Sequence, residues 1–175
     1  MYLISVYFDK DTNRILQRYI DKIAKETGND FMTKHKVPPH LTISSVEARS
    51  VEVLKPAMEA LENKLSAGDI KFVSIGQLLP YVIYTTPVMN DYLLDLSKTI
   101  YHQVKDIPET RVSPYYKPLS WLPHVTLGKQ LTKLQMQTAF IVMQDSFQVL
   151  DARITEIGLA KVNPHEDVVR FQLKS

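Results

Sequence analysis

The sequence of 175 residues contains no cysteine. This absence excludes disulfide bonds, thiolate nucleophiles and zinc sites with cysteine ligands. The chain also lacks an excess of charge of one sign. It has 21 Lys and Arg residues and 19 Asp and Glu residues, which gives a formal net charge of +2 at pH 7. A balance this mild permits a phosphate-bearing ligand but does not indicate a long nucleic-acid track.

Long apolar runs are absent as well. Residues 1–10 carry no basic leader, and their apolar run is too short for a signal peptide. No stretch approaches the length that crosses a bilayer. Hydrophobic residues make up 45% of the chain and charged residues 23%, which is typical of ordinary globular proteins. We therefore expect a soluble, cytoplasmic protein that binds no membrane, and we favour a monomer.

One five-residue pattern occurs twice, as Pro-His-apolar-Thr-apolar at residues 39–43 and 123–127. His and Thr alternate with aliphatic residues, which is the two-residue period of a β-strand. On each strand His and Thr should point to one face while the aliphatic side chains pack on the other. The separation of 84 residues between His40 and His124 indicates equivalent positions in two similar halves.

The order of expected elements repeats as well. The first half has the order strand, helix, His-Thr strand, helix, strand, at residues 2–8, 11–28, 40–44, 54–65 and 70–79. The second half has the same order at residues 81–86, 90–104, 124–128, 134–143 and 154–160, followed by a terminal strand at 168–173. The candidate helix N-caps are Asp11, Asn90 or Asp91, and Thr132 in a capping box with Gln135.

A second short match supports a duplication, because Ile75-Gly76 recurs as Ile157-Gly158 at nearly the same offset. We interpret the chain as one α+β domain built from two repeats, approximately residues 1–79 and 80–175. The connection near Pro80 is too short for a flexible linker, so the two lobes should pack rigidly.

The two histidines have a structural and a chemical interpretation. A histidine on a strand is more often a structural residue on a sheet face than a catalyst. If both face one cleft, however, one neutral imidazole can remove a proton from an attacking hydroxyl while a protonated one donates to the departing oxygen. Each neighbouring Thr can donate its hydroxyl proton to a nonbridging phosphate oxygen. Such an arrangement requires no metal.

The tetrads His40-Leu-Thr-Ile and His124-Val-Thr-Leu, within a duplicated chain of this length, resemble the two-histidine (2H) phosphoesterase superfamily and its 2′-5′ RNA ligase-like (LigT-like) group. The resemblance implies two pseudo-two-fold related lobes, each an antiparallel sheet with helices outside, flanking a central cleft. It implies that His40 and His124 are the catalytic acid–base pair, with either assignment open, and that Thr42 and Thr126 bind the phosphate.

The resemblance also implies the chemistry. The expected substrates are RNA termini or nucleotides with a 2′,3′-cyclic phosphate, hydrolysed without a cofactor, with 2′-5′ RNA ligation as the reverse reaction. This sequence departs from the group by having Gly128-Lys129 and no arginine after the second tetrad.

The loop before the second tetrad supplies three candidate substrate contacts, Tyr116, Lys117 and Trp121. Aromatic rings can stack a base and a lysine can meet a phosphate. Packing of the loop against the sheet would explain the aromatic residues equally well, and a solvated surface would explain the lysine. We expect ordinary packing or surface roles for the remaining candidates, Tyr115, His35, His102 and His165.

Two other functions compete with a metal-independent cyclic phosphodiesterase. The chain could be a non-catalytic RNA- or nucleotide-binding module that retains the two-histidine cleft. It could also hold zinc or another divalent metal on His40 and His124, but no Asp or Glu lies in phase on either strand to complete the ligand set.

Overall fold

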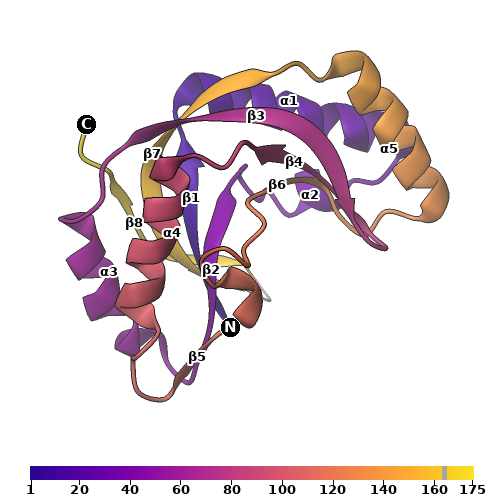
Figure 1. The fold of residues 1–175 in the computed structure, drawn as a ribbon. Helices are drawn as coiled ribbons and strands as arrows, with labels where there is room; N and C mark the ends of the chain where they lie inside the picture. The colour runs from indigo at the N-terminus through magenta and orange to yellow at the C-terminus, as the bar shows by residue number, and fades with distance from the viewer. Residues whose placement is uncertain (163–164) are drawn as a thin grey trace.

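The computed structural model describes residues 1–162 and 165–175 (Figure 1). The chain begins with the buried strand β1 (Tyr2–Phe8) and the helix α1 (Lys10–Thr27). The predicted N-cap of this helix, Asp11, is wrong: the cap is Asp9, whose side chain accepts a hydrogen bond from the backbone N of Thr12. Asp11 lies in the first turn and pairs with Arg14 instead.

The rest of the first repeat follows the predicted order. A short helix that was not predicted, α2 (Phe31–Lys34), lies between α1 and β2. The elements after it are β2 (Leu41–Ala48), the 3-10 turn η1 (Val51–Val53), α3 (Lys55–Glu62) and β3 (Gly68–Leu78). The predicted boundary between the repeats falls in the turn between β3 and β4.

The second repeat also keeps the predicted order, with additions. Its elements are β4 (Val82–Pro87), α4 (Asp91–Val104), β5 (Thr110–Val112), the 3-10 turn η2 (Pro114–Tyr116), β6 (Val125–Gly128), α5 (Lys133–Ser146), β7 (Leu150–Lys161) and β8 (Glu166–Gln172). Of the two candidate caps of α4 the structure uses Asn90, and the capping box of Thr132 and Gln135 is confirmed. Residues 163 and 164, between β7 and β8, lie outside the described residues.

The strands form one antiparallel sheet in the order β5-β2-β1-β7-β3-β4-β6, with β8 paired to β7. This confirms the α+β class and the antiparallel sheet. The order of the repeated strands is symmetric about the β7–β3 pair. The third strand of each repeat pairs with the first strand of the other repeat: β7 of the second repeat pairs with β1, and β3 of the first repeat pairs with β4. Each half of the sheet is therefore built from both repeats. The helices exchange in the same way, because α1 packs with α5 and α3 packs with α4.

The sheet is strongly curved, and Figure 1 shows β3 arching across the top of the view, with β4 and β6 beneath it. The curvature brings β6, the last strand of the path, into contact with β2 near the opposite end. The two His-Thr strands thus become neighbours although four strands separate them within the sheet.

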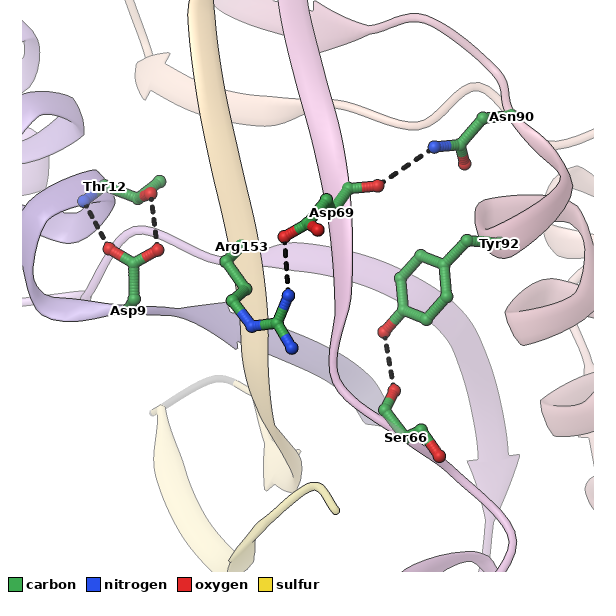
Figure 2. A network of polar contacts seen from close by, with 7 residues as sticks. All are labelled: Asp9, Thr12, Ser66, Asp69, Asn90, Tyr92 and Arg153. Carbon is green, nitrogen blue, oxygen red and sulfur yellow. Dashed lines mark hydrogen bonds and ion pairs between the residues drawn. The ribbon is translucent and has the colours of Figure 1, made fainter. Parts of the chain in front are cut away.

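A polar network at the β3–β7 junction fixes the centre of the sheet (Figure 2). Arg153 pairs with Asp69 at 2.7 Å, and the cap residue Asn90 donates to the carbonyl of Asp69 at 3.0 Å. Beside them, the hydroxyl of Tyr92 donates to the carbonyl of Ser66. Hydrogen bonds from the first residues of α4 therefore attach this helix to β3 and the segment before it.

Candidate functional site

The two tetrads have the same local structure. Each histidine lies one residue before its strand, at the start of β2 and β6. His and Thr are partly exposed in both, whereas the aliphatic residues between and after them are at most 1% exposed: Leu41, Ile43, Val125 and Leu127. The predicted alternation is confirmed, because the aliphatic side chains supply core while His and Thr share the other face.

The two imidazoles are held in the same orientation. Nδ1 of His40 lies 2.8 Å from the carbonyl oxygen of Pro38, and Nδ1 of His124 lies 2.9 Å from that of Leu122. A carbonyl oxygen only accepts hydrogen bonds, so Nδ1 carries the proton in both rings. Nε2 is then the atom that accepts a proton in the neutral ring or donates one in the imidazolium.

Burial lowers the pKa of both histidines below the ordinary value of 6.5, because the charged form loses hydration. The carbonyl contacts of Pro38 and Leu122 oppose this effect. The pKa of His40 is lowered further by the charges of His165 and His124, whereas Asp167 raises it. His124 is therefore close enough for its charge to influence the protonation of His40.

The threonines lie beside the histidines on the same face. The hydroxyl of Thr42 is 3.2 Å from that of Ser5 on β1. Thr126 pairs with Tyr84 of β4 in the sheet register. A hydroxyl can rotate to donate to an acceptor that enters, so both threonines are able to hydrogen-bond an oxyanion.

A tyrosine over a glycine supports each histidine, and sequence reasoning missed both tyrosines. The ring of Tyr84 packs against His124 at 5.2 Å between centroids, and it occupies the space beside Gly76, where an added Cβ would lie 2.5 Å from the ring. Tyr7 packs against His40 at 6.2 Å, and an added Cβ on Gly158 would lie 3.2 Å from its ring. The recurring Ile-Gly pair was the signal, since a glycine in a strand indicates close approach by a neighbour.

Arg170 of β8 is the second group that sequence reasoning missed. Its guanidinium lies 3.5 Å from the centroid of the Tyr7 ring, and its Nε pairs with Glu156 at 2.6 Å. Burial and the carboxylates of Asp167 and Glu156 raise the pKa of Tyr7 to about 12, although Arg170 opposes them. An arginine therefore lies on this face although none follows the second tetrad.

The three loop candidates differ in exposure. Trp121 is buried at 6% exposure, and its Nε1 donates to the backbone carbonyl of Thr42 at 3.0 Å. Tyr116 is partly buried against the core, and burial raises its pKa. Lys117 is exposed. The structure thus places the ring of Trp121 in packing against β2, and a substrate contact by any of the three stays a prediction.

The residues expected to have ordinary roles lie in ordinary settings. Tyr115 is 79% exposed, His35 stacks on Phe31 at 4.4 Å between ring centroids, and His102 packs beside Tyr101. His165 pairs with Asp167 at 3.3 Å and lies close enough to His40 to affect its pKa. Within residues 1–162 and 165–175, no three His, Cys, Asp or Glu side chains gather as a metal-binding group. No helix in the same residues is long and apolar enough to cross a membrane.

Known structures provide an independent comparison. A crystal structure of a phosphoesterase superposes with a TM-score of 0.66 at 15% identity, covering 99% of this chain and 98% of the other. E. coli LigT in its apo form gives 0.63 at 14% identity, covering 99% and 97%. A protein of Thermus thermophilus gives 0.64 at 15% identity, covering 99% and 98%. The chain has the LigT fold.

The LigT fold confirms, at the level of architecture, the resemblance that the paired tetrads indicated. No protein-family model and no curated protein sequence matches the chain. E. coli LigT has been crystallised with 3′-AMP, with ATP and with NADP+. These ligands were observed in that protein. At sequence identities near 15%, the similarity shows a shared fold and does not show that this chain binds the same ligands.

Proposed function

We propose that this chain is a 2H phosphoesterase that hydrolyses a 2′,3′-cyclic phosphate, or a related phosphodiester, at an RNA terminus or on a nucleotide. The observation that carries the proposal is the pair of His-x-Thr tetrads, with the same burial and the same Nδ1 contact, on two neighbouring strands. The nucleotides seen with E. coli LigT agree with such a substrate. We expect this chemistry to take place in the cytoplasm.

The reaction uses the two Nε2 atoms in opposite protonation states. The neutral histidine takes a proton from water as its oxygen bonds to phosphorus, and the protonated histidine gives its Nε2 proton to the ester oxygen that leaves. One P–O bond forms, one breaks, and the protons balance. Thr42 and Thr126 donate to the nonbridging oxygens, where negative charge collects. When the 5′-hydroxyl of an RNA replaces water as the nucleophile, the neutral histidine takes its proton, the P–O5′ bond forms, and the P–O3′ bond of the cyclic phosphate breaks as O3′ takes the proton of the other histidine, which leaves a 2′-5′ bond.

The hydroxyls and imidazoles of the site supply both proton transfer and phosphate binding, so the reaction needs no cofactor. Tyr116, Lys117 and Trp121 stay candidate secondary contacts of the substrate, and of the three only Lys117 is exposed. Which histidine is the base depends on which oxygen leaves.

The test is an activity screen of the whole protein with nucleoside 2′,3′-cyclic phosphates, cyclic-phosphate-ended RNA and 2′-5′ oligomers, in excess EDTA. His40→Ala and His124→Ala should each reduce turnover by about 10²–10⁴-fold, the usual contribution of a general acid or base. His102→Ala, a helical histidine outside the tetrads, is the control and should retain activity. Turnover in the double tetrad variant would contradict the proposal.

Calorimetry with a nucleoside 2′-phosphate separates the non-catalytic alternative. Binding of this product analogue without turnover of any substrate would indicate a binding module. Loss of activity in EDTA, restored by added metal, would indicate a metal site instead.

A further inference from the structure

Arg170 is fixed in place by contacts on two sides. The guanidinium lies on the ring of Tyr7, 3.5 Å from its centroid, and Glu156 contacts it at Nε. Gly158 lies beside this stack, and an added Cβ there would crowd it, at 3.0 Å from the carbonyl oxygen of Val169, 3.2 Å from Tyr7 and 3.4 Å from Cγ of Arg170. Arginine on an aromatic face loses little freedom when it binds a ligand, since the plane of the guanidinium is already set.

The contact with Glu156 occupies only one nitrogen of the guanidinium. Arginine has five N–H donors, and among the described residues the polar contact of the Arg170 guanidinium is the one that Nε makes with Glu156. The side chain is 34% exposed, so these donors are accessible to a solute. Two parallel N–H groups match two oxygens of a phosphate.

The sheet register places Arg170 in line with the first tetrad. Thr42 pairs with Ser5, Ser5 with Gly158, and Gly158 with Arg170, so the four residues form one row across β2, β1, β7 and β8. The side chains on this row share one face, as the hydroxyl contact of Thr42 and Ser5 confirms for its first pair. Gly158 leaves the middle of the row without a side chain.

Along the row, the backbone of Arg170 is set apart from that of Thr42. Adjacent strands lie about 4.8 Å apart, so three spacings separate Thr42 from Arg170. The guanidinium of Arg170 contacts the ring of Tyr7, and that ring in turn packs against His40, with 6.2 Å between the two ring centroids. A phosphate held by His40 and Thr42 therefore leaves the Nη donors of Arg170 for another anionic group.

We propose that Arg170 is a binding subsite for a second phosphate of the substrate, beyond the phosphate that reacts. This inference rests on the proposed function and specifies it: the enzyme prefers a cyclic phosphate whose nucleotide also carries a 5′-phosphate or a 5′-linked phosphodiester. Glu156 balances the charge of the guanidinium when the subsite is empty, and because it binds Nε it leaves the Nη donors for a ligand.

The experiment compares three substrates with the wild type: adenosine 2′,3′-cyclic phosphate, the same nucleotide with a 5′-phosphate, and a dinucleotide ending in the cyclic phosphate. The wild type should have a kcat/KM about tenfold higher for at least one of the two substrates with a second phosphate, as one bidentate charge-assisted contact predicts. A comparison of kcat/KM for the 5′-phosphorylated nucleotide and the dinucleotide shows whether the subsite prefers a terminal 5′-phosphate or a 5′-linked phosphodiester.

Arg170→Gln should abolish this preference, so that kcat/KM falls about tenfold more for the substrates with a second phosphate than for the plain cyclic nucleotide. Arg170→Lys keeps the charge, should retain the fold, and should lose most of the preference because it lacks the two-pronged geometry. Arg153→Gln is the matched control, since its ion pair with Asp69 joins β7 to β3 rather than lying on Tyr7. It should keep the preference.

Two results would overturn the inference: no preference in the wild type, or an equal loss on all three substrates in Arg170→Gln. Either result leaves the proposed function intact as long as the plain cyclic nucleotide is hydrolysed. Failure of the wild type to hydrolyse any substrate would instead contradict the proposed function. In that case calorimetry still tests the role of Arg170. The wild type should bind adenosine 3′,5′-bisphosphate more tightly than 3′-AMP, whereas Arg170→Gln should bind the two ligands with equal affinity.

Discussion

Gly76 and Tyr84 pair directly across β3 and β4, and the tyrosine ring fills the space where a side chain on residue 76 would lie. A Cβ there would stand 2.5 Å from Cζ of Tyr84, which is far inside van der Waals contact. The same ring packs against His124. Glycine at position 76 therefore allows the Tyr84 ring to lie where it packs against His124.

We therefore expect Gly76→Ala to displace the Tyr84 ring, destabilise the protein by about 1–3 kcal/mol as overpacking does, and reduce kcat. Urea denaturation and hydrolysis of a cyclic nucleotide measure the two effects. In a Tyr84→Ala background the added methyl group has no ring to meet, so Gly76→Ala should then cost little. Equal effects in both backgrounds would show that the glycine serves another purpose.

The pH dependence of hydrolysis follows from the two lowered histidine pKa values. The base must be neutral and the acid protonated, so kcat/KM has a bell shape whose maximum lies midway between the two pKa values. Because burial places both below 6.5, the maximum should lie on the acid side of pH 6.5. A maximum at or above pH 7 in the measured profile would be inconsistent with these two groups.

Stability should depend on pH through the same groups. Each histidine binds a proton less readily in the folded chain than in the unfolded chain, so the unfolded state takes up more protons below pH 6.5. The free energy of unfolding should therefore be undiminished above pH 6.5 and should decrease as the pH falls toward the folded-state values. Urea denaturation from pH 7.5 to pH 5 measures this slope, which the double variant His40→Gln/His124→Gln should flatten.

Trp121 anchors the loop before the second tetrad to β2 through the carbonyl of Thr42. Trp121→Phe removes the donor, leaves that carbonyl without its partner, and should cost about 1–3 kcal/mol of stability. Activity should fall several-fold because the backbone of Thr42 loses a fixed neighbour. Circular dichroism during urea denaturation reports stability, since Trp121 is the single tryptophan and its fluorescence is lost with it. Tyr115→Phe, at an exposed site in the same loop, is the control.

Much of the architecture could be predicted because it depends on neighbours in the chain. The alternation around His40 and His124, the capping box of Thr132 and Gln135, and the order of helices and strands are local patterns. The N-cap of α1 was placed two residues too late, since Asp9 and Asp11 are equally good caps by type and the end of β1 decides between them. The long β7 was underestimated because it pairs with both halves of the sheet.

The surroundings of the histidines were beyond local patterns. Tyr7 meets Gly158, and Arg170 meets Tyr7, across more than 150 residues of sequence, because the third strands are exchanged between the repeats. A pattern within one repeat cannot show which strand its third strand pairs with.

By itself, then, the sequence determined the two His-x-Thr strands, which of their faces is polar, and the class of chemistry that two imidazoles and two hydroxyls can perform. Only the tertiary structure decided that β2 and β6 become neighbours, that both imidazoles present Nε2, and that Arg170 reaches the face of the first tetrad. The physical reason is that side-chain alternation is set by each strand alone, whereas curvature, strand exchange and burial arise from the packing of the whole sheet.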